Sequence, residues 1–189
     1  MNPDPGSAEQ PWYDRSMSQL ELQTIVQADK WPETLTESAL AATVATALGR
    51  FVEFEGPVYA VVAFADNAAV QALNAQYRGM GKPTNVLSFP SVAPPLADQA
   101  SDNGQMSDNP AVSLGDIILA LETVQAEAGD QCIALEHHVA HLMIHGMLHL
   151  LGYDHKTAVA AEEMEALEID VLAVLDISNP YTEELVDAG

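Results

Sequence analysis

One segment of the chain, residues 145–155, reads HGMLHLLGYDH and contains three histidines at defined spacing. His145 and His149 are four residues apart, so a helix places both imidazoles on one face, one turn apart. Gly152 can adopt a positive φ that ends the helix, and the turn then brings His155 toward the other two. Three neutral imidazoles with one open position are typical of a catalytic zinc site, whereas a structural site needs a fourth protein ligand. The segment therefore predicts a helix with a metal site and, with it, a metal-dependent hydrolase.

A comparison with zinc peptidases narrows this prediction. Metzincin peptidases read HExxHxxGxxH, and the glutamate after the first histidine acts as general base. Gly146 stands at that position here, so the spacing of the ligands is kept while the proton-transfer group of a peptidase is missing. The alternative is that the histidines belong to an ordinary helix without a metal, which leaves the matching Gly152 and His155 as a coincidence.

The composition fits one globular domain of 189 residues, of which 48% are hydrophobic. The sequence contains no apolar run long enough to cross a membrane. The N-terminus lacks the basic and apolar regions of a signal peptide, and the single Cys132 excludes an internal disulfide. We therefore expect a cytoplasmic protein with no membrane partner, in which Cys132 is a small buried residue.

The charge of the chain is strongly acidic, with 28 acidic residues against six basic ones and a formal net charge of −22. Such a surface repels nucleic acids at long range, so charge alone argues against an RNA or DNA partner. Arg78 and Lys82, however, lie within five residues of each other, whereas the other cations are isolated. This pair either binds an anionic group or solvates a loop.

The pattern of hydrophobic residues predicts about four strands and five helices. Strands are expected at 20–26, 58–64, 85–89 and 114–120. Helices are expected at 37–52, 67–77, 121–128, 134–151 and 160–175. Together they predict a single α/β (α+β) domain with a roughly four-stranded mixed sheet and a zincin-like metal-site helix. We expect flexible tails at 1–16 and 182–189 and a long polar loop at 91–113.

Acidic residues accompany the last two elements of this pattern. The final helix has hydrophobic residues at helical spacing and four glutamates between them: Glu162, Glu163, Glu165 and Glu168. We expect these glutamates to form a solvated face. Asp154, beside His155, either caps the turn after the histidine helix or orients a metal ligand, and we favour the turn.

Three separated blocks of the sequence resemble the YbeY endoribonuclease family. The first is the HGMLHLLGYDH segment itself. The others are Leu73-Asn74 with Tyr77-Arg78-Gly79 and KPTNVLSFP at 82–90, and LGDI at 114–117, while EEMEALE at 162–168 also fits. The likeness extends over residues 17–181, which we take as the YbeY-like domain, and three blocks in this order make it highly specific.

The resemblance implies a bacterial, cytoplasmic, single-strand-specific endoribonuclease that depends on one bound zinc ion. It implies action in rRNA processing, notably at the 3′ end of the 16S rRNA of the small subunit, and in ribosome quality control. The implied partners are single-stranded RNA and the ribosome or ribosomal proteins, with no DNA. By the same resemblance His145, His149 and His155 bind the metal, and Arg78 is the catalytic residue.

The chemistry of Arg78 agrees with that role. A guanidinium is always charged and holds phosphate through two parallel N–H bonds, and with a metal ion it stabilises the charge that develops in phosphodiester cleavage. The candidate substrate-binding residues are Lys82, Asn85, Ser88 and His141. Asn85 and Ser88 fit equally well a role in holding the loop or strand, and His141 fits an ordinary partly buried histidine.

Several alternatives remain open from the sequence. With Gly146 in place of glutamate the general base is unassigned, and the attacking group is either a water activated at the metal or the 2′-hydroxyl of the RNA. The protein could also be a metal-dependent peptidase or other hydrolase, or a non-catalytic, metal-stabilised ribosome-assembly factor. Because the cations are few, we expect RNA binding to rely on a ribosomal partner or on divalent ions.

Overall fold

The computed structural model describes residues 19–28, 31–32, 35–91 and 111–181. Four strands in this part form one sheet in the order β1-β2-β4-β3. The strands are β1 (Leu20–Val26), β2 (Val58–Ala65), β3 (Val86–Pro90) and β4 (Val112–Ala120). β2 is parallel to both of its neighbours, β1 and β4, whereas β3 is antiparallel to β4. The predicted mixed, four-stranded sheet is confirmed.

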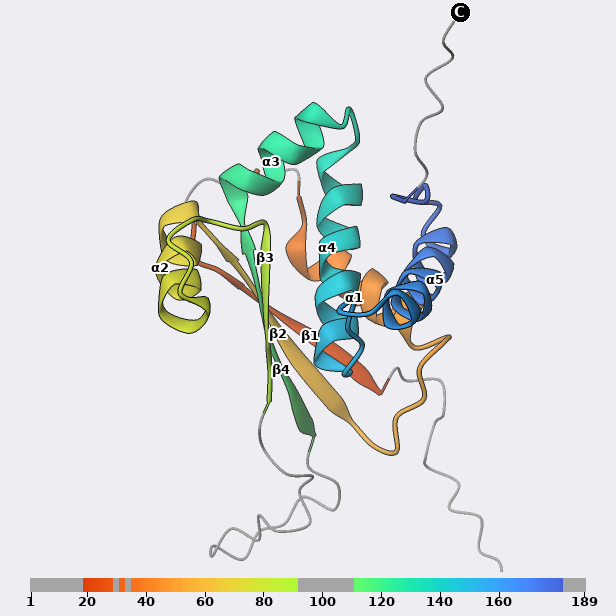
Figure 1. The fold of residues 1–189 in the computed structure, drawn as a ribbon. Helices are drawn as coiled ribbons and strands as arrows, with labels where there is room; N and C mark the ends of the chain where they lie inside the picture. The colour runs from red at the N-terminus through yellow and green to blue at the C-terminus, as the bar shows by residue number, and fades with distance from the viewer. Residues whose placement is uncertain (1–18, 29–30, 33–34, 92–110, 182–189) are drawn as a thin grey trace, which may run out of the picture.

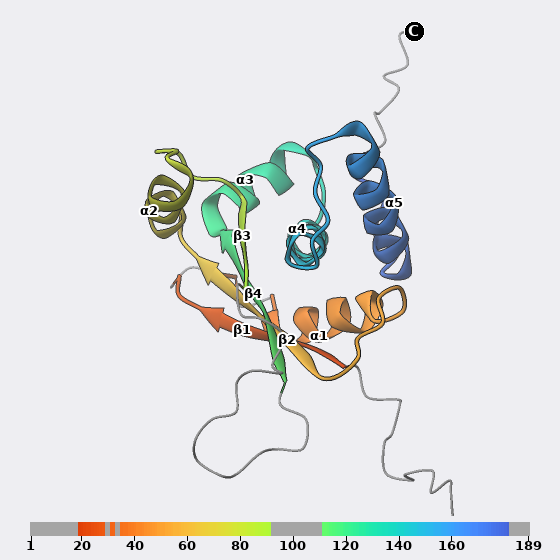
Figure 2. The ribbon, with the colours of Figure 1, turned by 60° about the horizontal axis from the view of Figure 1, so that its bottom comes forward.

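Five helices in the described part of the chain surround this sheet. They are α1 (Glu37–Leu48), α2 (Asn67–Arg78), α3 (Leu121–Asp130), α4 (Leu135–Leu150) and α5 (Ala158–Val174). α2 covers one face, α1 and α4 cover the other, and α5 packs on the outside of α4 (Figure 1). Figure 2 looks nearly along α4 and shows α1, α3, α5 and the sheet around it. The arrangement is a single α/β domain, as predicted.

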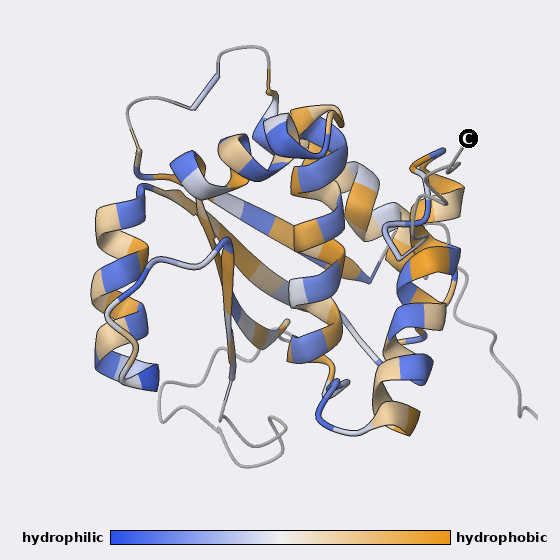
Figure 3. Ribbon diagram, turned by 45° about the horizontal axis from the view of Figure 1, so that its top comes forward, coloured by the Kyte–Doolittle hydropathy of each residue, from blue (hydrophilic) through white to orange (hydrophobic). Residues whose placement is uncertain are grey.

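Alternate residues along β2, β3 and β4 supply two separate hydrophobic cores, because successive side chains of a strand point to opposite faces. Phe64 and Ile117 face the larger core beneath α1 and α4. Leu87 and Ala120 face the smaller core, where Val70 of α2 packs. The outer helices α2 and α5 alternate hydrophilic and hydrophobic residues along their length (Figure 3). This alternation is typical of helices with one solvated face.

α4 differs from these helices because neighbours enclose it on most sides. Ten of its 16 residues are buried. A helix that is hydrophobic nearly all round belongs inside a domain, where packing fixes its side chains. α4 is therefore a rigid support for the histidines that it carries.

The structure corrects several boundaries. α1 ends at Leu48, four residues before the predicted end, and Phe51 beyond it is exposed. β4 begins at Val112, inside the predicted polar loop, because Val112 pairs with Val58 of β2. Most of that loop, 92–110, and the predicted tails at 1–16 and 182–189 lie outside the described residues.

Two further expectations concern single features. Cys132 is exposed and has a φ of 54°, at the turn between α3 and α4, so the prediction of a small buried residue is wrong. Turn geometry rather than packing places this cysteine. No helix in the described ranges is both long and apolar enough to cross a membrane.

Candidate metal site and groove

α4 and the turn that follows it bring the three predicted metal ligands together. His145 and His149 lie on one face of α4 with their Nε2 atoms 3.1 Å apart. Gly152 then adopts a φ of 94°, and the N–H of Tyr153 donates to the carbonyl of Leu148 at 3.0 Å. This turn returns His155 to the site, where its ring centroid lies 5.6 Å from that of His145. Within the described ranges these three histidines form the one group of metal-ligand side chains, with ligand atoms within 4.8 Å of one another.

The partners of the outer ring nitrogens of His145 and His149 show which nitrogen of these two histidines faces the site. Nδ1 of His149 lies 3.0 Å from the carbonyl oxygen of Tyr153, and Nδ1 of His145 lies 3.4 Å from Oε2 of Glu168. Both partners are acceptors, so each Nδ1 carries the proton and each Nε2 presents a lone pair. Two lone pairs that face each other at 3.1 Å repel unless a cation lies between them. On a tetrahedral zinc ion with bonds of about 2.0–2.1 Å, two such nitrogens are about 3.3 Å apart. The donor set therefore fits a bound metal.

The charge state of His149 also suits a ligand. Burial, with a smaller effect from His145, lowers the pKa of His149 below its ordinary value. A lowered pKa favours the neutral imidazole, which is the form that binds a metal.

The turn after α4 is held by Asp154, as the sequence predicts. Its Oδ1 accepts from the backbone N–H of His155 at 2.8 Å, and its Oδ2 accepts from Lys156. The hydrogen bond from Lys156 lowers the pKa of Asp154, so this carboxylate stays ionised.

The histidines lie in a groove of about 690 Å³. Its walls come from the end of α2, from β3 and the segment before it, from α4 and from the turn after α4. Arg78, the last residue of α2, lines this groove, and so does Lys156, which the sequence left as an isolated cation. The predicted metal ligands, Arg78, Asn85 and Ser88 are thus brought together around one groove.

The other two predicted substrate-binding residues are not among those that line the groove. Lys82 is exposed, and its carbonyl accepts from the side-chain amide of Asn74, which ties the loop to α2. His141 points instead to Glu168. Within the groove, the Asn85 amide is engaged inside the protein: Nδ2 donates to Glu127 at 3.0 Å, and Oδ1 accepts from the N–H of Val86 at 2.7 Å.

The packing at Gly146 explains the missing glutamate. A Cβ at this position would lie 2.9 Å from Cγ2 of Ile117 and 3.1 Å from Oγ of Ser88. The sheet therefore lies directly against α4 at the position where a peptidase has its general base, and it leaves no space for a side chain. The hydroxyl of Ser88 is the polar group that β3 brings to this position.

Comparisons with known proteins cover the part of the chain that forms this groove. The family model described as Endoribonuclease YbeY matches residues 25–176, a range that includes all three blocks and the three histidines. The chain belongs to the YbeY family.

Its relatives within the family align over most of their length. The protein named Endoribonuclease YbeY from Nitrobacter winogradskyi is 43% identical over 158 residues, which cover 83% of this chain and 80% of that protein. Its namesake from Allorhizobium ampelinum is 39% identical over 171 residues, covering 87% and 96%. That from Sphingopyxis alaskensis is 41% identical over 163 residues, covering 83% and 95%. A solution structure from Thermotoga maritima aligns with a TM-score of 0.49 and 22% identity, covering 86% of this chain and 99% of that chain.

One residue at the site of this family member contradicts the sequence prediction. Glu168 of α5 is not on a solvated face: it is fully buried, with 0% of its surface exposed. Oε1 lies 3.0 Å from Nε2 of His141, and Oε2 accepts from the hydroxyl of Tyr181 at 2.6 Å. Burial raises the pKa of Glu168, but the contacts with His141, His145 and Tyr181 outweigh it and lower the pKa to about 2. The carboxylate is therefore ionised inside the protein.

A signal for this burial was present in the sequence. Met164, Val171 and Leu172 are four residues before, three after and four after Glu168, and all three are buried. A residue at these spacings lies on the same face of the helix. The hydrophobic stripe of α5 thus includes Glu168.

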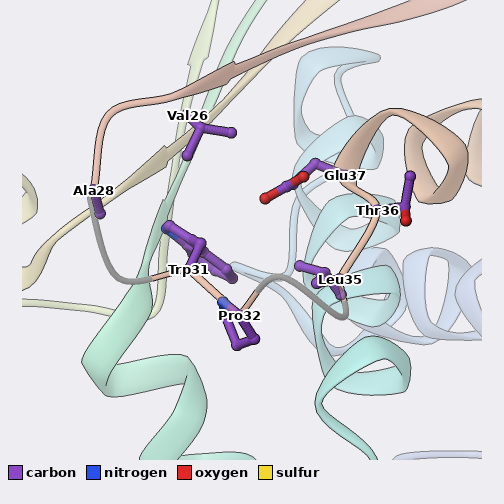
Figure 4. Close-up of a pocket in the computed structure, with 7 residues that line it drawn as sticks. All are labelled: Val26, Ala28, Trp31, Pro32, Leu35, Thr36 and Glu37. Atoms are coloured by element: carbon purple, nitrogen blue, oxygen red, sulfur yellow. The ribbon is translucent and has the colours of Figure 1, made fainter.

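A second pocket, of about 490 Å³, lies between the end of β1 and the start of α1 (Figure 4). Trp31 and Leu35 supply apolar walls, and Glu37 supplies the one acidic side chain among its lining residues. Those residues include no histidine, cysteine or basic side chain. The groove around His145 is therefore the candidate functional site.

Proposed function

We propose that this chain is a zinc-dependent endoribonuclease that cleaves single-stranded RNA. We further propose that it acts in the cytoplasm in rRNA processing, including the 3′ end of 16S rRNA, and in ribosome quality control, with ribosomal proteins as partners. The observation that carries the proposal is the groove in which three histidines with ligand atoms within 4.8 Å of one another lie with Arg78. The relatives that are named endoribonucleases support it.

His145, His149 and His155 would hold one zinc ion. When bound, the ion supplies Lewis acidity that stabilises negative charge on phosphoryl oxygens. The protein contributes the neutral state of His149 and the fixed orientation of two rings through acceptors at Nδ1. These features suit a site that must keep its metal while a charged substrate enters.

The cations of the groove would bind the RNA backbone. Of the four lysines and arginines in the described ranges, Arg78 and Lys156 line the groove. Arg78 would hold non-bridging phosphate oxygens through its planar fork of N–H groups. Because the rest of the chain is strongly acidic, the field of the protein disfavours RNA elsewhere and favours the strand at this groove.

Gly146 argues against the peptidase alternative. A peptidase of the metzincin type needs a carboxylate at this position, and the close packing of Ile117 and Ser88 leaves no room for one. A non-catalytic assembly factor would need the metal for stability but would not need a guanidinium in the groove.

An RNA cleavage assay with matched arginine variants tests the proposal. Labelled single-stranded and duplex RNA of the same sequence are incubated with wild type, Arg78→Ala and Arg50→Ala, and the zinc content of each protein is measured. We expect wild type to cut the single strand internally and spare the duplex, with Arg50→Ala unchanged, because Arg50 follows α1 outside the groove. Arg78→Ala should keep its zinc and lose about 100- to 1,000-fold in rate, the usual cost of one charge-stabilising donor.

Two outcomes would count against the proposal: zinc-loaded wild type that leaves single strands intact, or Arg78→Ala that cuts as fast as wild type. Analysis of the product ends then separates the two possible attacking groups. A cyclic phosphate indicates attack by the 2′-hydroxyl, and a 5′-phosphate indicates attack by water.

A further inference from the structure

The buried carboxylate of Glu168 has no role in the reaction as described above. Its side chain is removed from solvent, whereas Glu162 and Glu163 on the same helix are exposed. A buried carboxylate is costly unless hydrogen bonds and opposite charges surround it. Its position therefore points to a specific set of partners.

Those partners come from α4 and from the residues after α5, and each carboxylate oxygen has its own partners. Oε1 faces His141 of α4 at 3.0 Å, while Oε2 is shared by the hydroxyl of Tyr181 at 2.6 Å and Nδ1 of His145 at 3.4 Å. Burial and the nearby Glu168 carboxylate raise the pKa of Tyr181, so its hydroxyl stays protonated and donates. Tyr181 and His141 thus hold the carboxylate, and the carboxylate contacts His145.

We propose that Glu168 is a positioning residue for the metal site: by accepting from Nδ1 of His145 it fixes the tautomer and the ring orientation that direct Nε2 to the ion. This inference rests on the proposed metal site and not on the reaction that the loaded protein catalyses. In this arrangement His141, a candidate RNA contact in the sequence, instead holds Glu168 in place.

The chemistry favours a carboxylate over an amide at this position. A carboxylate has acceptors only, so it leaves His145 a single choice, with the proton on Nδ1. A negative acceptor also makes the opposite ring nitrogen a better metal ligand. Glutamine at 168 would turn an NH₂ group toward His141 or toward the two donors at Oε2, and would lose the charge.

In His149 the proton is also placed on Nδ1, but by a different acceptor. Its Nδ1 has the backbone carbonyl of Tyr153 as acceptor, within the turn that also carries Gly152. A backbone acceptor cannot be removed by substitution, so Glu168 is the position at which ligand orientation can be tested.

The test is the zinc affinity of metal-free protein, measured by competition with a chromophoric chelator. We expect Glu168→Gln to bind zinc about 10- to 100-fold more weakly than wild type, the usual effect of removing a group that orients a metal-bound histidine. Glu163→Gln, five residues earlier on the exposed side of α5, should bind as wild type does. In the same zinc-free samples, long-range ¹H–¹⁵N spectra should show the His145 proton on Nδ1 in wild type. In Glu168→Gln they should show a mixture of the two neutral tautomers, with the proton on Nδ1 in one and on Nε2 in the other.

A folded Glu168→Gln with unchanged zinc affinity would overturn the inference, even if its melting temperature fell, because a purely structural glutamate would give that result. If Glu168→Gln does not fold, Tyr181→Phe replaces it in the test. Tyr181 is 40% exposed, so we expect the fold to tolerate the loss of its hydroxyl. The substitution removes one donor from Oε2 of Glu168. We expect weaker zinc binding by Tyr181→Phe, and unchanged affinity would overturn the inference. Wild type that binds no zinc would instead refute the proposed function, and the His145 tautomer would still report on Glu168.

Discussion

Three histidines of α4 contact a carboxylate, and the contacts of the first and the last of them use opposite nitrogens of the ring. Near its start, Nε2 of His138 lies 2.8 Å from Oε2 of Glu127. Near its end, it is Nδ1 of His145 that faces the carboxylate of Glu168. The first contact occupies the nitrogen that a metal would need, and the second leaves it free toward the groove.

The surroundings of the two contacts explain the difference. His138 is 3% exposed, and Glu127 also accepts from Asn85, so that contact joins α3, α4 and the segment before β3. His145 is half-buried at the wall of a groove, with a second imidazole 3.1 Å away. The same pair of residue types is thus a cross-link within the core at one end of the helix and a candidate metal ligand at the other.

Removing the two histidines in turn should give the largest contrast. His145→Ala is expected to lose zinc and RNA cleavage below detection, while circular dichroism shows a retained fold, because Glu168 keeps His141 and Tyr181 as partners. His138→Ala is expected to keep one zinc ion per chain. Metal analysis of both proteins after gel filtration checks the contrast, and stoichiometric zinc in His145→Ala would remove this histidine from the ligand set.

In the absence of zinc, the order of the two variants should be reversed. His138→Ala, the variant expected to keep its zinc, should then lose more stability than His145→Ala. His138→Ala leaves Glu127 without its closest partner in a part-buried site, so we expect a loss of about 2–3 kcal/mol in the free energy of unfolding. His138→Gln, which restores a donor, should recover part of that loss. Urea titration in the presence of a chelator measures both values. An unchanged unfolding midpoint in His138→Ala would show that the contact is not a cross-link.

The three candidate ligands could be predicted from local sequence patterns, whereas the carboxylate partners of the histidines depend on packing between distant elements. Spacing of four residues and a turn glycine bring the three histidines together, so the sequence identifies the candidate metal site without reference to other elements. Glu168 lies on another helix, and its burial depends on how α5 packs against α4. The same reason explains Asn85, which lines the groove but has its amide held by Glu127, and His141, whose ring faces Glu168.

Charge in the groove gives a related lesson. The sequence singled out Arg78 and Lys82 as a pair because they are close along the chain. In the fold Arg78 and Lys156 both line the groove, because the end of α2 and the turn after α4 each supply part of its wall. Proximity in sequence identified one of the two cations that line the groove.

Gly146 offers a way to disturb the groove end of α4 without changing a ligand. An added methyl group would press on the side chain of Ile117 and the hydroxyl of Ser88, so we expect Gly146→Ala to lose about 1–3 kcal/mol of stability. Its zinc affinity should stay within a few-fold of wild type. Gly146→Glu should be less stable still and should show no peptidase activity on a casein substrate. Peptide cleavage by Gly146→Glu would mean that the sheet yields, and that packing is not what excludes the general base.

Lys156 should give the smallest effect and the sharpest separation between holding the metal and holding RNA. Its side chain is 84% exposed and paired with Asp154, and an exposed pair of this kind contributes little to stability. We therefore expect Lys156→Gln to keep its unfolding midpoint and its zinc affinity. If Lys156 contacts a phosphate, the slope of log affinity for single-stranded RNA against log salt concentration should fall by about one unit relative to wild type. Lys82→Gln is the matched control, since Lys82 is exposed but does not line the groove. An equal change in slope for both variants would indicate a diffuse effect of net charge, because a contact inside the groove should be lost only with Lys156.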